Sequence, residues 1–263
     1  MVSQASNPPR QFRPGLTSVT FRRLSVETIA REAADAGLQV IEWGGDVHAP
    51  PGDLARAGQI RALSQSYGLS VTYGSYYRLG ERDPASPAFS AVVESALALG
   101  ATTIRTWAGR RGSADADADY WRRVVDDAHE AAALASAHQL SVSLERHCHT
   151  LTDRIDAHCT LLERLPLANV YTYWQPDATE SVAANAASLR RVLPRLTNVH
   201  VFNFQPPSTF LPLGESAAAW HTYLAVLRDS PRPHDFMLEF VQDDSLDAFR
   251  RDAADLCSWL ATA

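Results

Sequence analysis

The sequence predicts a single (β/α)8 TIM barrel, and three observations support this fold class. Strand-like and helix-like segments alternate eight times without a break, which indicates parallel strands joined by crossover helices. The chain has 263 residues, 46% of them hydrophobic, and such barrels take about 250 residues. The first predicted strand lacks a following Gly-x-Gly-x-x-Gly motif, which disfavours the alternative, a doubly wound open sheet that binds a dinucleotide.

The predicted strands begin after a polar, proline-containing segment at the N-terminus. We therefore expect residues 1–14 to form a flexible tail and residues 15–263 to form the barrel. The eight predicted strands cover residues 15–21, 38–43, 69–75, 102–107, a fifth segment that begins at Ser141, 169–174, 198–204 and 235–241.

Capping residues and glycines mark the helices between these strands. Ser25 and Asp53 precede helical patterns, and their side-chain oxygens can accept hydrogen bonds from the first turn. Gly37 and Gly100 end two helices, because glycine readily takes the left-handed conformation found there. Further helices are predicted at residues 88–99, 118–138 and 217–228, and after caps at Thr152 or Asp153, Ser181 and Ser245.

The charge of the chain disfavours a nucleic acid as partner. The formal net charge is −6, and the arginines are scattered rather than gathered into a basic face. No apolar run approaches the roughly 18 residues of a membrane span, and the N-terminus lacks the apolar core of a signal peptide. The three cysteines have no metal-binding spacing, so we expect a reducing, cytoplasmic setting without membrane attachment.

The sequence contains no lysine, and all 24 residues counted as Lys or Arg are arginine. This excludes Schiff-base chemistry by a lysine amine. The lysine of a phosphate-binding loop is also absent, together with its glycine-rich pattern. Chemistry at a carbonyl group would need another electrophile, for which a metal ion is the obvious candidate.

The most informative motif lies at the end of the fifth predicted strand and contains Glu145, His147 and His149 at alternate positions. Side chains two residues apart on a strand share a face, so Glu145 and His147 point together, as does His149 if the strand continues. A carboxylate and imidazoles on one face suit a metal site or proton transfer. A solvated loop after a strand would carry similar polar residues.

Two other predicted strands carry polar residues within apolar runs. His200 interrupts the seventh strand, and Glu239 interrupts the eighth. A buried carboxylate is costly unless it is paired or bound to a metal, so a buried salt bridge would explain either residue alone. In a closed barrel the ends of these strands can converge with that of the fifth. Glu145, His200 and Glu239 together therefore predict a site for a divalent metal.

Aromatic and polar residues at other strand ends are candidates for substrate contacts. Aromatic faces suit the C–H faces of a sugar, although each aromatic residue alone could be an ordinary part of the core. The candidates are Trp43, His48, Tyr73, Arg105, Trp107, Trp174 and Asn203.

Taken in order, these motifs resemble those of the sugar phosphate isomerase/epimerase family, which has the xylose isomerase-like TIM barrel shared with the AP-endonuclease family 2 superfamily. The resemblance covers residues 15–260, and its most specific part is the Glu-x-His pattern followed by Thr-Leu-Thr-Asp. The motifs are Val40-Ile-Glu-Trp43, Leu144-Glu-x-His147 with Thr150-Leu-Thr-Asp153, Trp174-Gln-Pro176, Asn198-Val-His-Val-Phe-Asn203 and Leu238-Glu239.

The resemblance implies one divalent metal, such as manganese, magnesium, cobalt or zinc. Its ligands would be Glu145, Gln175, His200 and Glu239. Gln175 stands where the family usually has aspartate. An amide oxygen can ligate a hard cation but adds no negative charge, so the site would bind metal more weakly or prefer another ion. Asp177, two residues later, is a candidate substitute for this ligand.

The resemblance also implies a mechanism, because the two metal-bound glutamates of the isomerases and epimerases move the proton. Glu145 and Glu239 would remove and return a proton beside a carbonyl, through an enediolate. His147 would hydrogen-bond a substrate hydroxyl, and Arg105 would help to stabilise the enediolate. The acidic charge disfavours the DNA-binding branch of the superfamily.

The activity expected from this resemblance is that of a metal-dependent isomerase or epimerase of a sugar or polyol. A dehydratase or a C-glycoside-cleaving lyase would begin with the same proton abstraction, and Gln175 keeps a third alternative open, a carbohydrate-binding barrel without metal. The loops 76–87 and 205–214 are expected to cover the mouth and set specificity. Phe204, Phe210 and Trp220 would also suit a contact between two copies of the chain, in a homo-oligomer.

Overall fold

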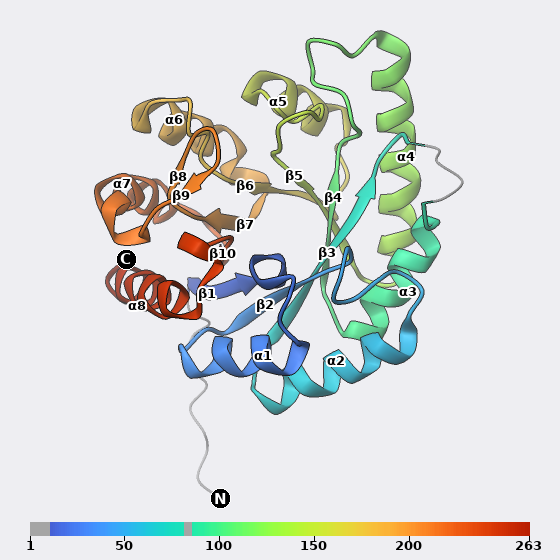
Figure 1. The fold of residues 1–263 in the computed structure, drawn as a ribbon. Helices are drawn as coiled ribbons and strands as arrows, with labels where there is room; N and C mark the ends of the chain where they lie inside the picture. Colours follow the sequence, from blue (N-terminus) through green and yellow to red (C-terminus); the bar gives the residue numbers. More distant parts are fainter. Residues whose placement is uncertain (1–10, 82–85) are drawn as a thin grey trace, which may run out of the picture.

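The structure, a computed structural model, describes residues 11–81 and 86–263, and in these residues eight parallel strands form a closed barrel surrounded by eight α-helices (Figure 1). Neighbouring strands follow the order β1-β10-β7-β6-β5-β4-β3-β2, which confirms the predicted (β/α)8 barrel. The barrel strands are β1 (Phe12–Thr17), β2 (Val40–Gly44), β3 (Ser70–Arg78), β4 (Thr103–Trp107), β5 (Ser141–Glu145), β6 (Val170–Trp174), β7 (Leu196–Val201) and β10 (His234–Leu238).

The first strand begins earlier than predicted, at Phe12 rather than at Gly15. Phe12 pairs with His234 of β10, and the neighbouring Arg13 forms a two-pronged ion pair with Asp235, with N–O distances of 2.7 and 2.9 Å. These contacts tie the start of the chain to the last strand of the barrel. Residues 1–10 of the predicted tail lie outside the described residues.

The helices follow the strands as predicted, and most of the predicted caps are confirmed. Ser25, Asp53, Ser181 and Ser245 each accept a hydrogen bond from a backbone N–H in the first turn. The helices are α1 (Val26–Asp35), α2 (Leu54–Ser66), α3 (Phe89–Leu99), α4 (Ala118–Ser136), α5 (Ile155–Arg164), α6 (Val182–Val192), α7 (Ala217–Leu227) and α8 (Leu246–Thr262). Among the described residues, none of the helices has the length and apolar character needed to span a membrane.

The predicted cap of the fifth helix is wrong. The N-cap residue of α5 is Arg154, and no side chain caps this helix. Both predicted residues bind elsewhere: the Thr152 hydroxyl donates to the carbonyl of Glu145 at 2.6 Å, and the Asp153 carboxylate accepts from the N–H of Ser113 at 3.1 Å. These residues therefore stabilise the loop that follows β5 rather than the helix.

Strand alternation divides the molecule into a polar barrel interior and an apolar layer beneath the helices. Ile104, Leu144 and Val199 are fully buried and belong to the apolar core. Each of them precedes a polar residue on the same strand, and successive side chains on a strand point to opposite faces. Arg105, Glu145 and His200, the residues that follow, therefore face into the barrel.

Gly15 permits the close approach of β1 to its neighbours. A Cβ atom at this position would lie 2.7 Å from the carbonyl oxygen of Val40 on β2 and 2.6 Å from the sulfur of Met237 on β10. The carbonyl oxygen belongs to the paired backbone of β2 and cannot move away without disturbing the sheet. A side chain at position 15 would therefore strain the barrel where it closes.

We expect Gly15→Ala to lower the free energy of unfolding by about 1–3 kcal/mol, because the added methyl group overpacks the barrel. Denaturant-induced unfolding of the wild type and the variant measures this difference. Gly58→Ala is the matched control, because Gly58 lies on α2 with no atom near the position of its missing Cβ. This control should be stabilised by up to about 1 kcal/mol. Equal stability of Gly15→Ala and wild type would contradict the packing described.

Candidate metal centre

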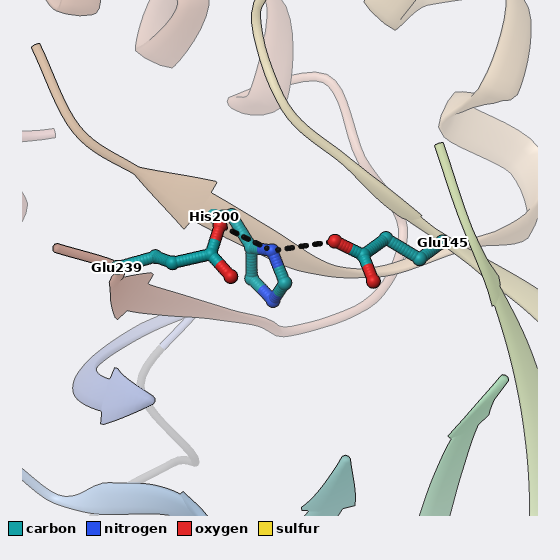
Figure 2. A group of neighbouring side chains, drawn as sticks. All are labelled: Glu145, His200 and Glu239. Atoms are coloured by element: carbon teal, nitrogen blue, oxygen red, sulfur yellow. Dashed lines mark ion pairs between the residues drawn. The ribbon is translucent and has the colours of Figure 1, made fainter. Parts of the chain in front are cut away.

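Glu145, His200 and Glu239 meet inside the mouth of the barrel, as Figure 2 shows. Glu145 ends β5, His200 lies on β7, and Glu239 directly follows β10. The Nδ1 atom of His200 is 3.4 Å from Oε1 of Glu145 and 3.1 Å from Oε2 of Glu239. All three residues are buried, so the two carboxylates approach one imidazole away from bulk water.

Gln175 supplies a fourth ligand atom, an amide oxygen, at the same point. It directly follows β6, and its Oε1 atom is 3.1 Å from Nδ1 of His200. Asp177, the alternative ligand, has other partners: its carboxylate pairs with Arg146 at 3.3 Å and accepts two hydrogen bonds from Thr179. The structure therefore brings the four predicted metal ligands together and places Asp177 outside the cluster.

Glu145 is held rigidly by donors on one of its two oxygens. Arg105 and the indole N–H of Trp107 both donate to Oε2 of Glu145, which leaves Oε1 facing His200. Arg105 in turn donates from Nε to Glu42 at 2.8 Å, and Arg105, Glu42 and Glu145 are all buried. A buried ion chain, Glu42–Arg105–Glu145, thus fixes the orientation of one predicted ligand.

Gly74 on β3 makes room for this ion chain. A Cβ atom at position 74 would lie 2.6 Å from Nη2 of Arg105 and 2.8 Å from Oε1 of Glu42.

Glu42 was not among the predicted site residues, although its position within the apolar run Val40-Ile-Glu-Trp43 is the same kind of signal that identified Glu239. The buried Nε2 of His200 lies 4.0 Å from Glu42, so this carboxylate also faces the second nitrogen of the predicted metal-ligating imidazole.

Opposite charges shift the pKa values of the cluster further than burial does. Burial alone would raise the pKa of Glu145, but Arg105 and then His200 outweigh burial and hold this pKa well below its usual range. Burial alone would lower the pKa of His200, but Glu239 and Glu145 raise it to about 10. Without a metal, His200 is therefore an imidazolium that offsets part of the negative charge of the carboxylates.

The donor set fits a divalent metal ion. One atom from each of Glu145, His200 and Glu239 lies within 4.8 Å of the others, and Gln175 adds an amide oxygen. Two carboxylates, an imidazole and a neutral oxygen are ligands that manganese, magnesium, cobalt and zinc accept in proteins. A divalent cation at this point would take the place of the proton on His200, since a metal-ligating histidine is neutral.

A cavity of about 390 Å³ opens above the cluster, and its lining includes several predicted site residues. Glu145, Gln175 and Glu239 reach it from the cluster, and Arg105, Trp107 and His147 border it beside Glu145. The rings of Trp107 and His147 are in contact, with centroids 4.9 Å apart. His149 lies beyond the end of β5, in an exposed turn with a φ angle of 58°.

The other predicted substrate contacts do not line this cavity. Trp43 and Trp174 are fully buried, and their indole N–H groups donate to Ser64 on α2 and Ser188 on α6. They point outward because each follows an inward-facing residue on its strand. The remaining three have local partners instead: the Tyr73 hydroxyl donates to Ala49, the His48 ring contacts Ser18, and the Asn203 amide donates to Pro212.

We expect Gln175→Asp to lower the Kd for Mn²⁺ by at least about tenfold, because a carboxylate replaces a neutral amide among the ligands. Gln175→Leu should raise the Kd by a similar factor, because it removes the oxygen. Titration calorimetry measures both. Asp177→Asn is the control and should leave the Kd unchanged, because Asp177 faces Arg146. Weaker binding by Gln175→Asp, or unchanged binding by Gln175→Leu, would contradict the assignment of Gln175 as a ligand.

Comparisons with solved structures find many similar chains. The probable 3-DHS dehydratase AsbF of Bacillus anthracis, involved in petrobactin synthesis, has a TM-score of 0.77 at 20% identity, covering 93% of this chain and 98% of that one. D-psicose 3-epimerase in the presence of D-fructose has a TM-score of 0.71 at 16% identity, covering 94% and 97%. At these identities the similarity shows a shared fold.

A third solved structure is a xylose isomerase-like TIM barrel protein of Mycobacterium smegmatis in complex with magnesium. It has a TM-score of 0.69 at 15% identity, covering 95% of this chain and 97% of that one. Among curated proteins, no sequence matches at a significant level. The family model described as xylose isomerase-like TIM barrel matches residues 30–262, which is most of the chain. The chain therefore belongs to the xylose isomerase-like TIM barrel family.

Proposed function

We propose that this protein is a divalent-metal-dependent isomerase or epimerase that acts on a sugar or polyol by moving a proton beside a carbonyl group. One observation carries the proposal: oxygens of Glu145 and Glu239 approach the same imidazole nitrogen from two strands, beneath an open cavity. A substrate above His200 would lie between two carboxylates, one to take a proton and one to return it.

Four side chains would hold the metal, namely Glu145, Gln175, His200 and Glu239. When bound, the cation supplies polarisation of the substrate carbonyl, which makes the neighbouring C–H more acidic. The chain has no lysine, so no amine can take over this role. Arg105 adds a fixed positive charge beside Glu145, where negative charge would develop on the substrate.

The two glutamates are held differently, which suggests different roles for them. Glu145 accepts hydrogen bonds from Arg105 and Trp107. Its low pKa makes it a weak base, which suits a metal ligand better than a group that removes a proton. Glu239 has His200 as its ion-pair partner and lines the cavity. We therefore assign the first proton abstraction to Glu239. Glu145 would have to take up a proton from water before it could deliver one to the opposite face of the substrate, whereas a transfer on one face would return the proton that Glu239 took.

His147 is positioned for a hydroxyl group of the substrate rather than for the proton transfer itself. Its ring lines the cavity against Trp107, and its Nδ1 atom is 2.7 Å from the carbonyl oxygen of Cys148. This contact favours a proton on Nδ1 and leaves Nε2 to meet the substrate. The C–H face of a sugar would pack against the indole ring of Trp107.

A lyase acting on a keto-sugar, either a dehydratase or an enzyme that cleaves a C-glycoside after oxidation, is the second candidate. A probable dehydratase, AsbF, has the same fold, so this fold is compatible with a lyase as well as with an epimerase. The first step is the same: a glutamate takes the proton beside the carbonyl, and the C–H electron pair forms an enolate. In an epimerase a proton returns to the same carbon, and in an isomerase it is added to the neighbouring carbon. In a lyase the electron pair instead expels the group on the next carbon, which leaves with a proton.

Exchange of substrate hydrogen with deuterated water tests the common first step. We expect the protein with Mn²⁺ to incorporate deuterium beside the carbonyl of ketoses such as D-fructose or D-tagatose, measured by NMR. Glu239→Gln should slow this exchange by at least about 10²-fold, because an amide cannot accept the proton. Glu94→Gln, on the exposed surface of α3, is the control and should exchange like the wild type.

The metal content of each variant must be measured beside the exchange, because Glu239 is also a proposed ligand. Unchanged exchange in Glu239→Gln with its metal retained would contradict the role of this glutamate as base. Deuterium incorporation together with formation of an isomer or epimer of the substrate would support isomerisation or epimerisation, whereas loss of water or of a leaving group would support the lyase.

A further inference from the structure

Four phenylalanine rings form one wall of the cavity above the metal centre, and we call Phe202, Phe204, Phe210 and Phe240 the phenylalanine wall. Phe204 and Phe210 lie on a short antiparallel hairpin, β8 (Phe204–Gln205) and β9 (Thr209–Phe210), that follows β7. All four side chains are partly exposed. Apolar rings gathered at a cavity rather than in the core indicate a surface kept for binding.

The wall is preformed by ring contacts and by backbone hydrogen bonds. The Phe210 ring lies at its centre, with centroids 5.1 Å from Phe204, 5.1 Å from Phe240 and 6.4 Å from Phe202. Asn203 fixes the base of the hairpin, because its backbone carbonyl accepts from Leu211 at 2.8 Å and its side-chain amide donates to Pro212 at 2.9 Å. A ligand would therefore meet rings that are already arranged.

Phe240 is held in an unusual backbone conformation beside the metal centre. Its φ angle of 60° lies in the left-handed region, which costs a bulky residue of the order of 1 kcal/mol or more. Its backbone N–H donates to the Thr20 hydroxyl at 3.0 Å, which holds this conformation in place. Because Phe240 directly follows Glu239, the same turn places a proposed metal ligand and a ring of the wall on one cavity.

Every arginine that lines the cavity in the described part of the chain already has an acidic partner. Arg22 pairs with Asp46 at 2.8 Å, and Arg146 pairs with Asp177 at 3.3 Å. Arg105 is shared between Glu42 and Glu145. A phosphate group would have to displace one of these carboxylates to form a two-pronged ion pair with an arginine, so a neutral sugar suits this lining better than a phosphorylated one.

We propose that the substrate is an unphosphorylated keto-sugar that carries an apolar substituent, with its polar half at the metal centre and its apolar half, such as an aromatic ring, on the phenylalanine wall. The inference rests on the proposed function for the polar half only. The cavity volume of about 390 Å³ falls in the range of clefts that hold drug-sized ligands, about 300–1,000 Å³. Aromatic rings stack on one another at the centroid spacings that this wall presents.

Binding of paired ligands tests this inference independently of catalysis. Calorimetry with the Mn²⁺-loaded protein compares the phenyl and methyl 3-keto-β-D-glucopyranosides, which differ in the apolar substituent alone, and D-fructose with D-fructose 6-phosphate. We expect the phenyl compound to bind at least about tenfold more tightly than the methyl compound, and the phosphate to give no gain over free fructose. Deuterium exchange is recorded for the same compounds.

Variants of the wall make the test specific. Phe210→Ala, or Phe204→Ala if the first variant unfolds, should reduce the phenyl-to-methyl affinity ratio to under about threefold. Tyr67→Ala is the control, because Tyr67 is exposed at the end of α2, outside the cavity, and the ratio should stay at its wild-type value. The oligomeric state of each variant is measured by sedimentation.

Three results would overturn the inference: equal affinities for the phenyl and methyl compounds, tighter binding of the phosphorylated ketose, or conversion of an oligomer to a monomer by the wall variants with an unchanged affinity ratio. The last result would make the wall a contact between two copies of the chain. Failure of the proposed function is distinguishable, because no compound would then exchange deuterium, whereas the affinity ratio would still report on the wall.

Discussion

Charge compensation inside the barrel is the constraint on which the candidate site depends. Three carboxylates, those of Glu42, Glu145 and Glu239, share the barrel mouth with one guanidinium, that of Arg105, around His200. With a neutral imidazole, three negative charges and one positive charge leave two negative charges in a buried space, which is costly. A proton on His200 cancels one of them, and a divalent cation would cancel both. The cluster is therefore consistent with a divalent ion in the place of this proton.

The barrel supplies this arrangement through strand alternation and close packing. Because every second residue faces inward, Glu42, Arg105 and His200 project from different strands into the same interior. Gly74 leaves space for the ion chain, and the tryptophans that face outward hold the strands to the helices by hydrogen bonds. The polar floor of the cavity is thus rigid, and the phenylalanine wall beside it comes from the hairpin and the turn after Glu239. Rigid ligands and a separate apolar wall would let one fold combine proton transfer with recognition of a substituent.

Much of the fold and the centre of the site could be predicted from the sequence, because both leave local patterns. Alternating segments and caps at Ser25, Asp53, Ser181 and Ser245 identified the barrel. Polar residues within apolar strands identified Glu145, His200 and Glu239, which the structure brings together. The signal was clear because a charged group in a buried strand is costly unless it is paired or bound to a metal.

The rest depends on which way side chains point and on contacts distant in sequence. Strand alternation separates Glu42 from Trp43, so only one of them can face the cavity, and the outward Trp43, Tyr73 and Trp174 were expected at the mouth. The cap of α5 was misplaced because the two predicted residues form other hydrogen bonds. Thr152 donates to the carbonyl of Glu145, and Asp153 accepts from the N–H of Ser113. The phenylalanine wall forms because the loop after β7 folds into a hairpin, and this hairpin could not be predicted from the sequence of the loop alone.

The metal content of the purified protein, measured by elemental analysis, tests the central claim most directly. The account predicts about one divalent ion per chain in the wild type, and loss of that ion in a Glu145→Gln, Glu239→Gln double variant that remains folded. Absence of metal from both proteins, even after manganese or zinc is added, would contradict the metal centre and favour a barrel that binds carbohydrate without catalysis.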